Sequence, residues 1–307
     1  SGSHGYYKFP DETAKTGLVD LGISVNSFGF RGKEFLPSKP ANTYRVFCTG
    51  GSSTFSSECP DGLSYPEQLE AILNKRVTGQ TSYEIINAGF DGFRVDHILA
   101  LLQKEILNYQ PDCITVCEAF TAIEDHALVL DTTGKKLFWW MHGIFYQRSL
   151  LYSDLVLWMG SRDLETAGLM ASSSVKLARY ARDLASIYQA LQKAKAKLVF
   201  ILQPVLPKQQ MRALTVHSGG ADSGDQEYLE REYIRFFSGL HSTFISTMER
   251  VAAERSITLV DPRKAFLNHS APAELFVDYI HLSPGGSRVL AEEIARVFIR
   301  DKIGPAE

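Results

Sequence analysis

The sequence predicts an α/β fold in which an open, mostly parallel sheet is covered by helices on both faces. Three observations predict it. Five short apolar runs of β type alternate with longer segments of helical periodicity. The run at 113–117 is apolar almost throughout, which is typical of a central strand buried on both faces. Apolar residues make up 45% of the 307 residues, which excludes a disordered chain.

Each element is supported by its own pattern. The expected strands cover residues 44–48, 82–87, 113–117, 198–202 and 257–261. The expected helices cover residues 64–76, 94–109, 174–195, 226–255 and 284–300. Ser64 and Glu67 form an S-x-x-E capping box at the start of the first helix. The second helix has apolar residues at helical spacing, namely Val95, Ile98, Leu99, Leu102 and Ile106.

Three segments fall outside this alternation. Residues 1–43 are expected to form an N-terminal arm packed on a single domain that covers 44–307. Residues 119–173 carry many aromatic residues, including Trp139, Trp140 and Trp158. They are read as core for an added helical layer, as a cap over an apolar acyl pocket, or as a homo-oligomer interface. Residues 204–225 form a polar loop, read as a mobile lid or as a plain connection.

Composition narrows the function classes. Lys and Arg total 32 against 35 Asp and Glu, a net charge of −3, which argues against a nucleic-acid binder. No apolar run reaches the length of a membrane span. The four cysteines do not match a zinc framework and are expected to be buried free thiols, which slightly favours the cytoplasm. Residues 1–4 resemble the remnant of a cleaved tag, so the localisation stays unknown.

Two short motifs carry hydroxyl, imidazole and carboxylate groups. Gly50, Gly51 and Ser52 follow the first strand, but the segment lacks the Lys of a phosphate loop and the pattern of a nucleophile elbow. Asp278 and His281 lie three residues apart before the last helix. A serine hydrolase needs a base beside the hydroxyl and an acid that orients the imidazole. Taken singly, each motif is more typical of an ordinary turn.

Together the motifs resemble the SGNH (GDSL-like) hydrolases. Residues 50–55 (GGSSTF) resemble the first block of that family, 87–92 (NAGFDG) the second and 278–281 (DYIH) the fifth. The segment 26–32 (NSFGFRG) resembles an extension found in some bacterial members. The resemblance implies a flavodoxin-like three-layer α/β/α sandwich with a five-stranded parallel sheet. By position it also implies Ser52 as nucleophile, His281 as general base and Asp278 as its orienting acid.

The same resemblance implies an oxyanion hole in which the backbone N–H groups of Ser52 and Gly92 take part. The third block departs from the family pattern, because Thr121 stands where the family has an Asn donor. A Thr hydroxyl can donate but is shorter. Glu118, Glu124 and Asp125 lie nearby and are read first as solvated acids.

The expected function is an esterase that cleaves a small-molecule or carrier-bound acyl ester through an acyl-Ser52 intermediate. No metal and no organic cofactor is implied. One alternative is an acyltransferase or tailoring enzyme that delivers the same acyl group to an acceptor other than water. A second is a binding module on a decayed hydrolase fold, which retention of Ser52, Asp278 and His281 disfavours.

Overall fold

A computed structural model describes residues 22–76, 81–119, 168–206 and 241–305, with only the backbone at 168–175. Within these ranges, five strands form one parallel sheet in the order β2-β1-β3-β4-β5. The strands are β1 (Thr43–Gly50), β2 (Ser82–Gly89), β3 (Cys113–Cys117), β4 (Lys197–Ile201) and β5 (Thr258–Val260). The predicted parallel sheet is confirmed, and β3 has the predicted bounds.

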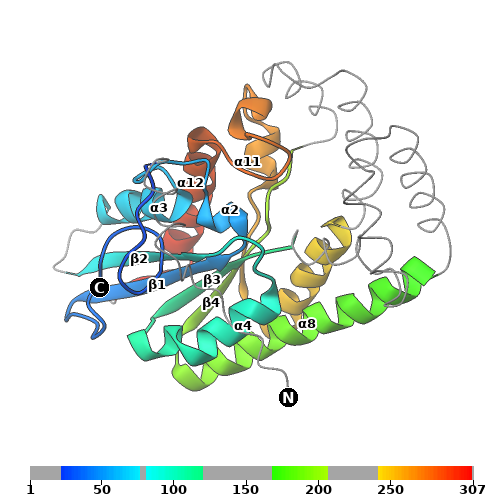
Figure 1. Cartoon of the computed structure of the whole chain (residues 1–307), viewed down its shortest axis with the longest axis horizontal. Helices are drawn as coiled ribbons and strands as arrows, with labels where there is room; N and C mark the ends of the chain where they lie inside the picture. Colours follow the sequence, from blue (N-terminus) through cyan, green and yellow to red (C-terminus); the bar gives the residue numbers. More distant parts are fainter. Residues whose placement is uncertain (1–21, 77–80, 120–167, 207–240, 306–307) are drawn as a thin grey trace, which may run out of the picture.

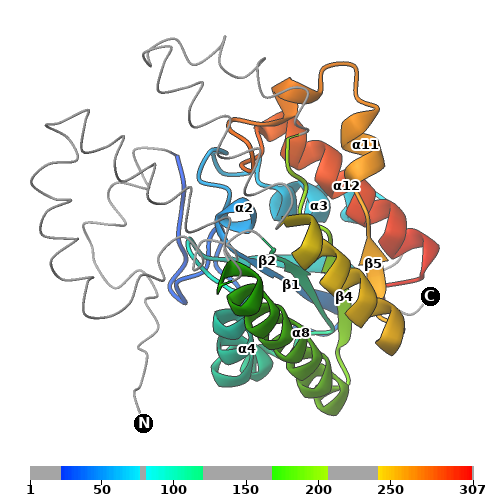
Figure 2. The same cartoon turned by 90° about the vertical axis from the view of Figure 1, so that its right-hand side faces the viewer.

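Helices cover both faces of this sheet (Figure 1). The helical elements include α2 (Ser52–Phe55), α3 (Tyr65–Asn74), α4 (Val95–Lys104), η1 (Ile106–Tyr109), α8 (Gly168–Ala194), α11 (Arg263–Leu267), η3 (Pro272–Leu275) and α12 (Pro284–Arg300). Residues 241–255 form a further helical stretch. Helices α3 and α12 lie on one face, and α4, α8 and 241–255 lie on the other (Figure 2). The chain therefore forms a three-layer α/β/α sandwich.

Two buried clusters of apolar side chains match these layers. One joins the sheet to α4, α8 and 241–255, with Ile98, Leu184 and Phe244 fully buried. The other joins the opposite face to α3 and α12, with Leu69 and Ile294 fully buried. Burial on both faces explains why the central strands are nearly continuous apolar runs.

Local signals account for several helix boundaries. The capping box at Ser64 and Glu67 is present at the start of α3, as predicted. The helix predicted over 94–109 is wrong at its end, because α4 stops at Lys104 and a 3₁₀ turn follows. That turn places the Tyr109 carbonyl 2.7 Å from Nη1 of Arg45, a buried guanidinium whose burial the periodicity does not reveal.

The remaining expectations fall partly outside the described ranges. Helix α8 begins at Gly168 rather than at residue 174, so its start lies within the predicted aromatic segment. The tryptophans of that segment and most of the 204–225 loop lie beyond the described residues. All four thiols are free and buried, as predicted, and burial raises the pKa of Cys48 to about 12. None of the described helices is long and apolar enough to cross a membrane.

Residues 22–42 form neither a helix nor a strand, and part of this segment packs against the sheet. Phe30 is fully buried and stands in edge-to-face contact with Phe47 of β1, with ring centroids 5.6 Å apart. Arg31 forms an antiparallel bridge with Asn87 at the end of β2. This segment therefore reaches the edge of the sheet where parallel strands end, which is where α/β proteins place their sites.

Candidate active site

The Ser52 side chain lies at the carboxyl edge of the sheet. Strand β1 ends at Gly50, Gly51 caps α2, and Ser52 is the first residue of that one-turn helix. A Cβ atom at Gly50 would lie 2.1 Å from Thr54 Oγ1 and 2.4 Å from the carbonyl oxygen of Cys117. Only glycine therefore lets the chain turn this tightly from β1 into α2 and present Ser52 at the edge.

Two buried side chains hold α2 from its other end. The Arg31 guanidinium donates to the Phe55 carbonyl at 2.6 Å and also to the Ser56 carbonyl. The Asn87 amide donates to the Thr54 carbonyl at 2.8 Å. Both side chains are at most 3% exposed. The last carbonyls of a helix have no partner inside it, so these donors satisfy them and fix α2 on the sheet.

The loop before α12 brings an imidazole to Ser52. His281 Nε2 lies 2.8 Å from Ser52 Oγ, and His281 Nδ1 lies 2.6 Å from Asp278 Oδ2. The other Asp278 oxygen accepts from the backbone N–H groups of Ile280 and His281, at 2.8 and 2.7 Å. The structure thus unites three residues from two ends of the chain, as the resemblance implies. Because His281 Nδ1–H donates a hydrogen bond to Asp278, the Nε2 atom carries no proton and can accept a hydrogen bond from the Ser52 hydroxyl.

The environment shifts the pKa values of this pair in opposite directions. Burial alone would lower the pKa of His281, but the hydrogen bond and charge of Asp278 raise it above its ordinary value. Burial alone would raise the pKa of Asp278, but the hydrogen bonds to His281 and Ile280 lower it. The pair is therefore arranged to stabilise a protonated imidazole beside a carboxylate, which a proton-accepting histidine needs during catalysis.

Two more acidic groups influence His281, and the sequence reading did not single them out for this role. The charges of Glu58 and Asp91 both add to the rise in the pKa of His281. Burial, followed by the charge of Glu58, raises the pKa of Asp91 itself. Glu58 follows α2 and Asp91 follows β2, so both come from the same sheet edge as Ser52. The site is thus more acidic than its three central residues suggest.

Of the three predicted oxyanion donors, Ser52 and Gly92 belong to the described residues. The Phe90 N–H donates to the Gly50 carbonyl at 3.1 Å, which ties the loop after β2 to the turn before α2. Gly92 lies in this loop with φ +71°, and a Cβ there would meet no atom within 4 Å among the described residues. This loop borders the Ser52 turn and leaves open space at Gly92. Thr121 lies outside the described residues, and so do Glu124 and Asp125.

Glu118 corrects one expectation. It is read from the sequence as a solvated acid, but it is only 1% exposed at the end of β3. The Tyr180 hydroxyl of α8 donates to the Glu118 backbone carbonyl at 2.6 Å. The prediction was wrong because Glu118 directly follows a strand that is covered on both faces. A single acidic residue after an apolar run does not reveal this burial.

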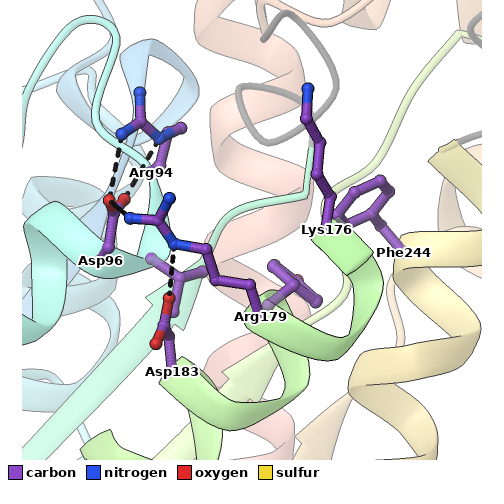
Figure 3. Close-up of a pocket in the computed structure, with 8 residues that line it drawn as sticks. Arg94, Asp96, Lys176, Arg179, Asp183 and Phe244 are labelled. Atoms are coloured by element: carbon purple, nitrogen blue, oxygen red, sulfur yellow. Dashed lines mark hydrogen bonds and ion pairs between the residues drawn. The ribbon is translucent and has the colours of Figure 1, made fainter. Parts of the chain in front are cut away.

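A hollow on the α4 and α8 face is lined by a network of ion pairs. Figure 3 shows Asp96 between Arg94 and Arg179, and Asp183 below Arg179. Arg179 Nη2 lies 2.7 Å from Asp96 Oδ2, and Arg94 Nη2 lies 3.0 Å from the same atom. The hollow encloses about 60 Å³ and is also lined by Lys176 and Phe244. Of these pairs, Arg179 with Asp96 connects α8 to α4, and partly exposed pairs of this kind typically stabilise a fold by less than about 1 kcal/mol each.

Comparisons with known proteins place the fold. Neither protein-family models nor curated proteins match the sequence. Solved structures do. An alpha/beta hydrolase enzyme from the metagenome of Lake Arreo, Spain, has a TM-score of 0.51 at 16% identity, over 83% of this chain and 94% of the other. The lipase/acylhydrolase from Enterococcus faecalis has a TM-score of 0.51 at 15% identity, over 84% and 96%.

A variant of an acetyl xylan esterase from Geobacillus stearothermophilus is similar to the same extent. Its TM-score is 0.50 at 14% identity, over 85% of this chain and 96% of the other. Each match covers most of both chains, so the likeness concerns the whole sandwich rather than one motif. The chain therefore shares its three-layer α/β/α fold with these hydrolases.

Proposed function

We propose that the chain is a serine esterase that cleaves carboxylic esters through an acyl-Ser52 intermediate. The observation that carries the proposal is the pair of contacts made by His281, 2.8 Å to Ser52 Oγ and 2.6 Å to Asp278 Oδ2. A hydroxyl, a base and an orienting acid in this geometry are what nucleophilic catalysis at an acyl carbon requires.

In the proposed mechanism, Ser52 Oγ attacks the ester carbonyl while its proton passes to His281 Nε2. Asp278 stabilises the resulting imidazolium through Nδ1–H. The oxyanion is assigned to the backbone N–H groups of Ser52 and Gly92, with the Thr121 hydroxyl as a third donor. The tetrahedral intermediate then collapses, and His281 returns the proton to the departing alcohol. A water molecule attacks the acyl-Ser52 ester by the same steps and releases the acid.

Replacing the nucleophile tests this proposal. Ser52→Ala should lower the turnover of reactive esters by about 10⁴-fold or more, because no hydroxyl remains for His281 to activate. The panel should include acetyl and longer acyl esters, since an acetyl xylan esterase and a lipase/acylhydrolase share the fold. Ser186→Ala is a matched control, because the Ser186 hydroxyl donates to the Arg182 carbonyl within α8, at 2.9 Å, and not to a group of the site. Unchanged turnover in Ser52→Ala would remove Ser52 from the mechanism.

The same assay addresses acyl transfer, which shares the covalent intermediate. Products are compared with and without a nucleophilic acceptor such as an amine or an alcohol. Release of free acid in both conditions supports hydrolysis. Conversion of most acyl groups to the acceptor product would instead make the chain an acyltransferase with the same Ser52 chemistry.

The pH dependence follows from the raised pKa of His281. Only the neutral imidazole accepts the Ser52 proton, so kcat/KM should fall as pH drops through the pKa of His281. Because that pKa is above its ordinary value of 6.5, half of the activity should be lost at a pH above 6.5. Glu58→Gln removes one of the charges that raise this pKa and should move the acid limb to lower pH. An acid limb well below pH 6.5 in the unmodified chain would contradict this account.

A further inference from the structure

A series of buried hydrogen bonds joins the ends of two strands, β3 and β4, to helix α2, which carries Ser52, and to the loop that carries His281. The N–H of Ala119, two residues after the end of β3, donates to Gln203 Oε1 at 2.9 Å. Gln203, two residues after the end of β4, donates through Nε2 to Ser53 Oγ at 2.8 Å. Ser53 Oγ in turn donates to the Ile280 carbonyl at 3.3 Å. All four residues are at most 5% exposed.

The chemistry of the groups determines which atom donates and which accepts in each of these hydrogen bonds. A backbone N–H can only donate, so the Gln203 oxygen must face Ala119 and the amide nitrogen must face Ser53. An amide nitrogen can only donate as well, so Ser53 Oγ accepts from it and keeps its own proton for Ile280. The carbonyl of Ile280 can only accept. Each of these side chains is therefore held in one orientation.

The two residues joined by the last link stand next to the reacting pair. Ser53 follows Ser52 in α2, and Ile280 precedes His281 in the loop. The Ser53 link therefore restrains the separation between α2 and that loop. A second bond supports the loop, because the Leu206 N–H donates to the Tyr279 carbonyl at 2.8 Å. The segment after β4 therefore contacts the loop that carries His281 through Leu206, and contacts α2 through the hydrogen bond from Gln203 to Ser53.

We propose that Gln203 and Ser53 are positioning residues that hold His281 Nε2 within hydrogen-bond distance of Ser52 Oγ. The expected effect of these residues on kcat rests on the proposed function. Neither side chain touches the reacting atoms; both act through the backbone next to them. Gln203 lies outside all three motifs that resemble the hydrolase family, so the resemblance does not assign it this role.

The first test removes the hydroxyl that joins the two loops. Ser53→Ala should lower kcat by about tenfold with KM nearly unchanged, since small displacements of a catalytic pair slow the reaction without weakening substrate binding. Ser56→Ala is the matched control. Ser56 lies at the other end of α2 and is equally buried, but its hydroxyl bonds only to carbonyls of Ser53 and Thr54. A kcat loss in Ser53→Ala no larger than in Ser56→Ala would overturn the proposal.

The second test asks whether Gln203 and Ser53 act in one chain. Gln203→Met has a similar volume and removes both the carbonyl oxygen and the NH2 of the side-chain amide, and it should also lower kcat by about tenfold. The double variant should be no slower than the slower single variant, because Gln203 orients the Ser53 hydroxyl and has nothing left to orient once that hydroxyl is removed. Effects that multiply to about a hundredfold would show that the two residues act independently and would contradict the proposal. Circular dichroism verifies that each variant is folded.

A structural readout separates this inference from the proposed function. A crystal structure of Ser53→Ala gives the Ser52 Oγ to His281 Nε2 distance without any substrate. We expect it to lengthen from 2.8 Å to beyond hydrogen-bond range, and to remain short in Ser56→Ala. If the distance lengthens while the unmodified chain cleaves no ester, the proposed function fails and the positioning role stands. If esters are cleaved but distance and kcat do not change in Ser53→Ala, the positioning role fails.

Discussion

His281→Ala should lower kcat for ester cleavage by about 10⁴- to 10⁶-fold. A serine hydroxyl is a poor nucleophile until a base removes its proton, and His281 Nε2 lies 2.8 Å from Ser52 Oγ. Among the described residues, His281 is the histidine that contacts both Ser52 and Asp278. Its loss therefore removes the proton acceptor of the first step and the proton donor to the departing alcohol.

His269→Ala is the control for this prediction. His269 also lies on the connection between β5 and α12, and its Nδ1 accepts from the Ala271 N–H at 3.2 Å. Within the described part of the chain it makes no hydrogen bond or ion pair to Ser52 or Asp278, so its replacement should leave kcat within about twofold. Steady-state kinetics on the same ester measures both variants. Equal losses in the two variants would mean that the effect comes from disturbing the connection and not from lost base catalysis.

Gly89→Ala should lower the free energy of unfolding by about 3 kcal/mol. A Cβ at Gly89 would lie 2.3 Å from the Phe55 backbone nitrogen and 2.7 Å from the Thr54 backbone carbon. Both atoms belong to α2, which Arg31 and Asn87 hold in place, so the backbone there cannot move aside cheaply. Urea unfolding measures the loss as a lower midpoint.

The matched control is Gly62→Ala. Gly62 has φ +84°, and a Cβ there would meet no atom within 4 Å among the described residues. That variant carries backbone strain of about 1 kcal/mol but no clash. Gly89→Ala should also lower ester turnover, because a displaced α2 moves Ser52, whereas Gly62→Ala should not. A Gly89→Ala midpoint at or above that of Gly62→Ala would contradict the close packing of α2 against β2.

Much of the fold is readable from local patterns. The bounds of β3 follow from a run of five apolar or β-branched residues between Pro111 and a charged residue, and the start of α3 follows from its capping box. The end of α4 does not follow from periodicity, because Ile106 keeps the apolar spacing while Glu105 leaves helical geometry, with φ −137° and ψ −60°. A long-range hydrogen bond from Arg45 to the Tyr109 carbonyl accompanies that break, and local sequence patterns do not predict it.

The site divides in the same way. Ser52, Asp278 and His281 lie in short motifs, so their types and spacing point to them before any coordinates exist. Arg31, Gln203 and Glu58 lie outside the three blocks that suggested the catalytic residues, although Arg31 belongs to the N-terminal segment that also resembles the family. Their sequence signal is weak: Gln203 is a single polar residue at the end of an apolar run. Only the packing of β4 beside β3 reveals that its amide reaches both Ala119 and Ser53.

The central claim is that Ser52 is a nucleophile activated by His281. Its most direct test is covalent labelling with a fluorophosphonate, followed by mass spectrometry of the proteolysed chain. The account predicts one labelled site, on the peptide that contains Ser52, with labelling at least a thousandfold slower in His281→Ala. The claim would be contradicted by label on another residue, by absence of label on Ser52, or by equal labelling rates in the unmodified protein and in His281→Ala.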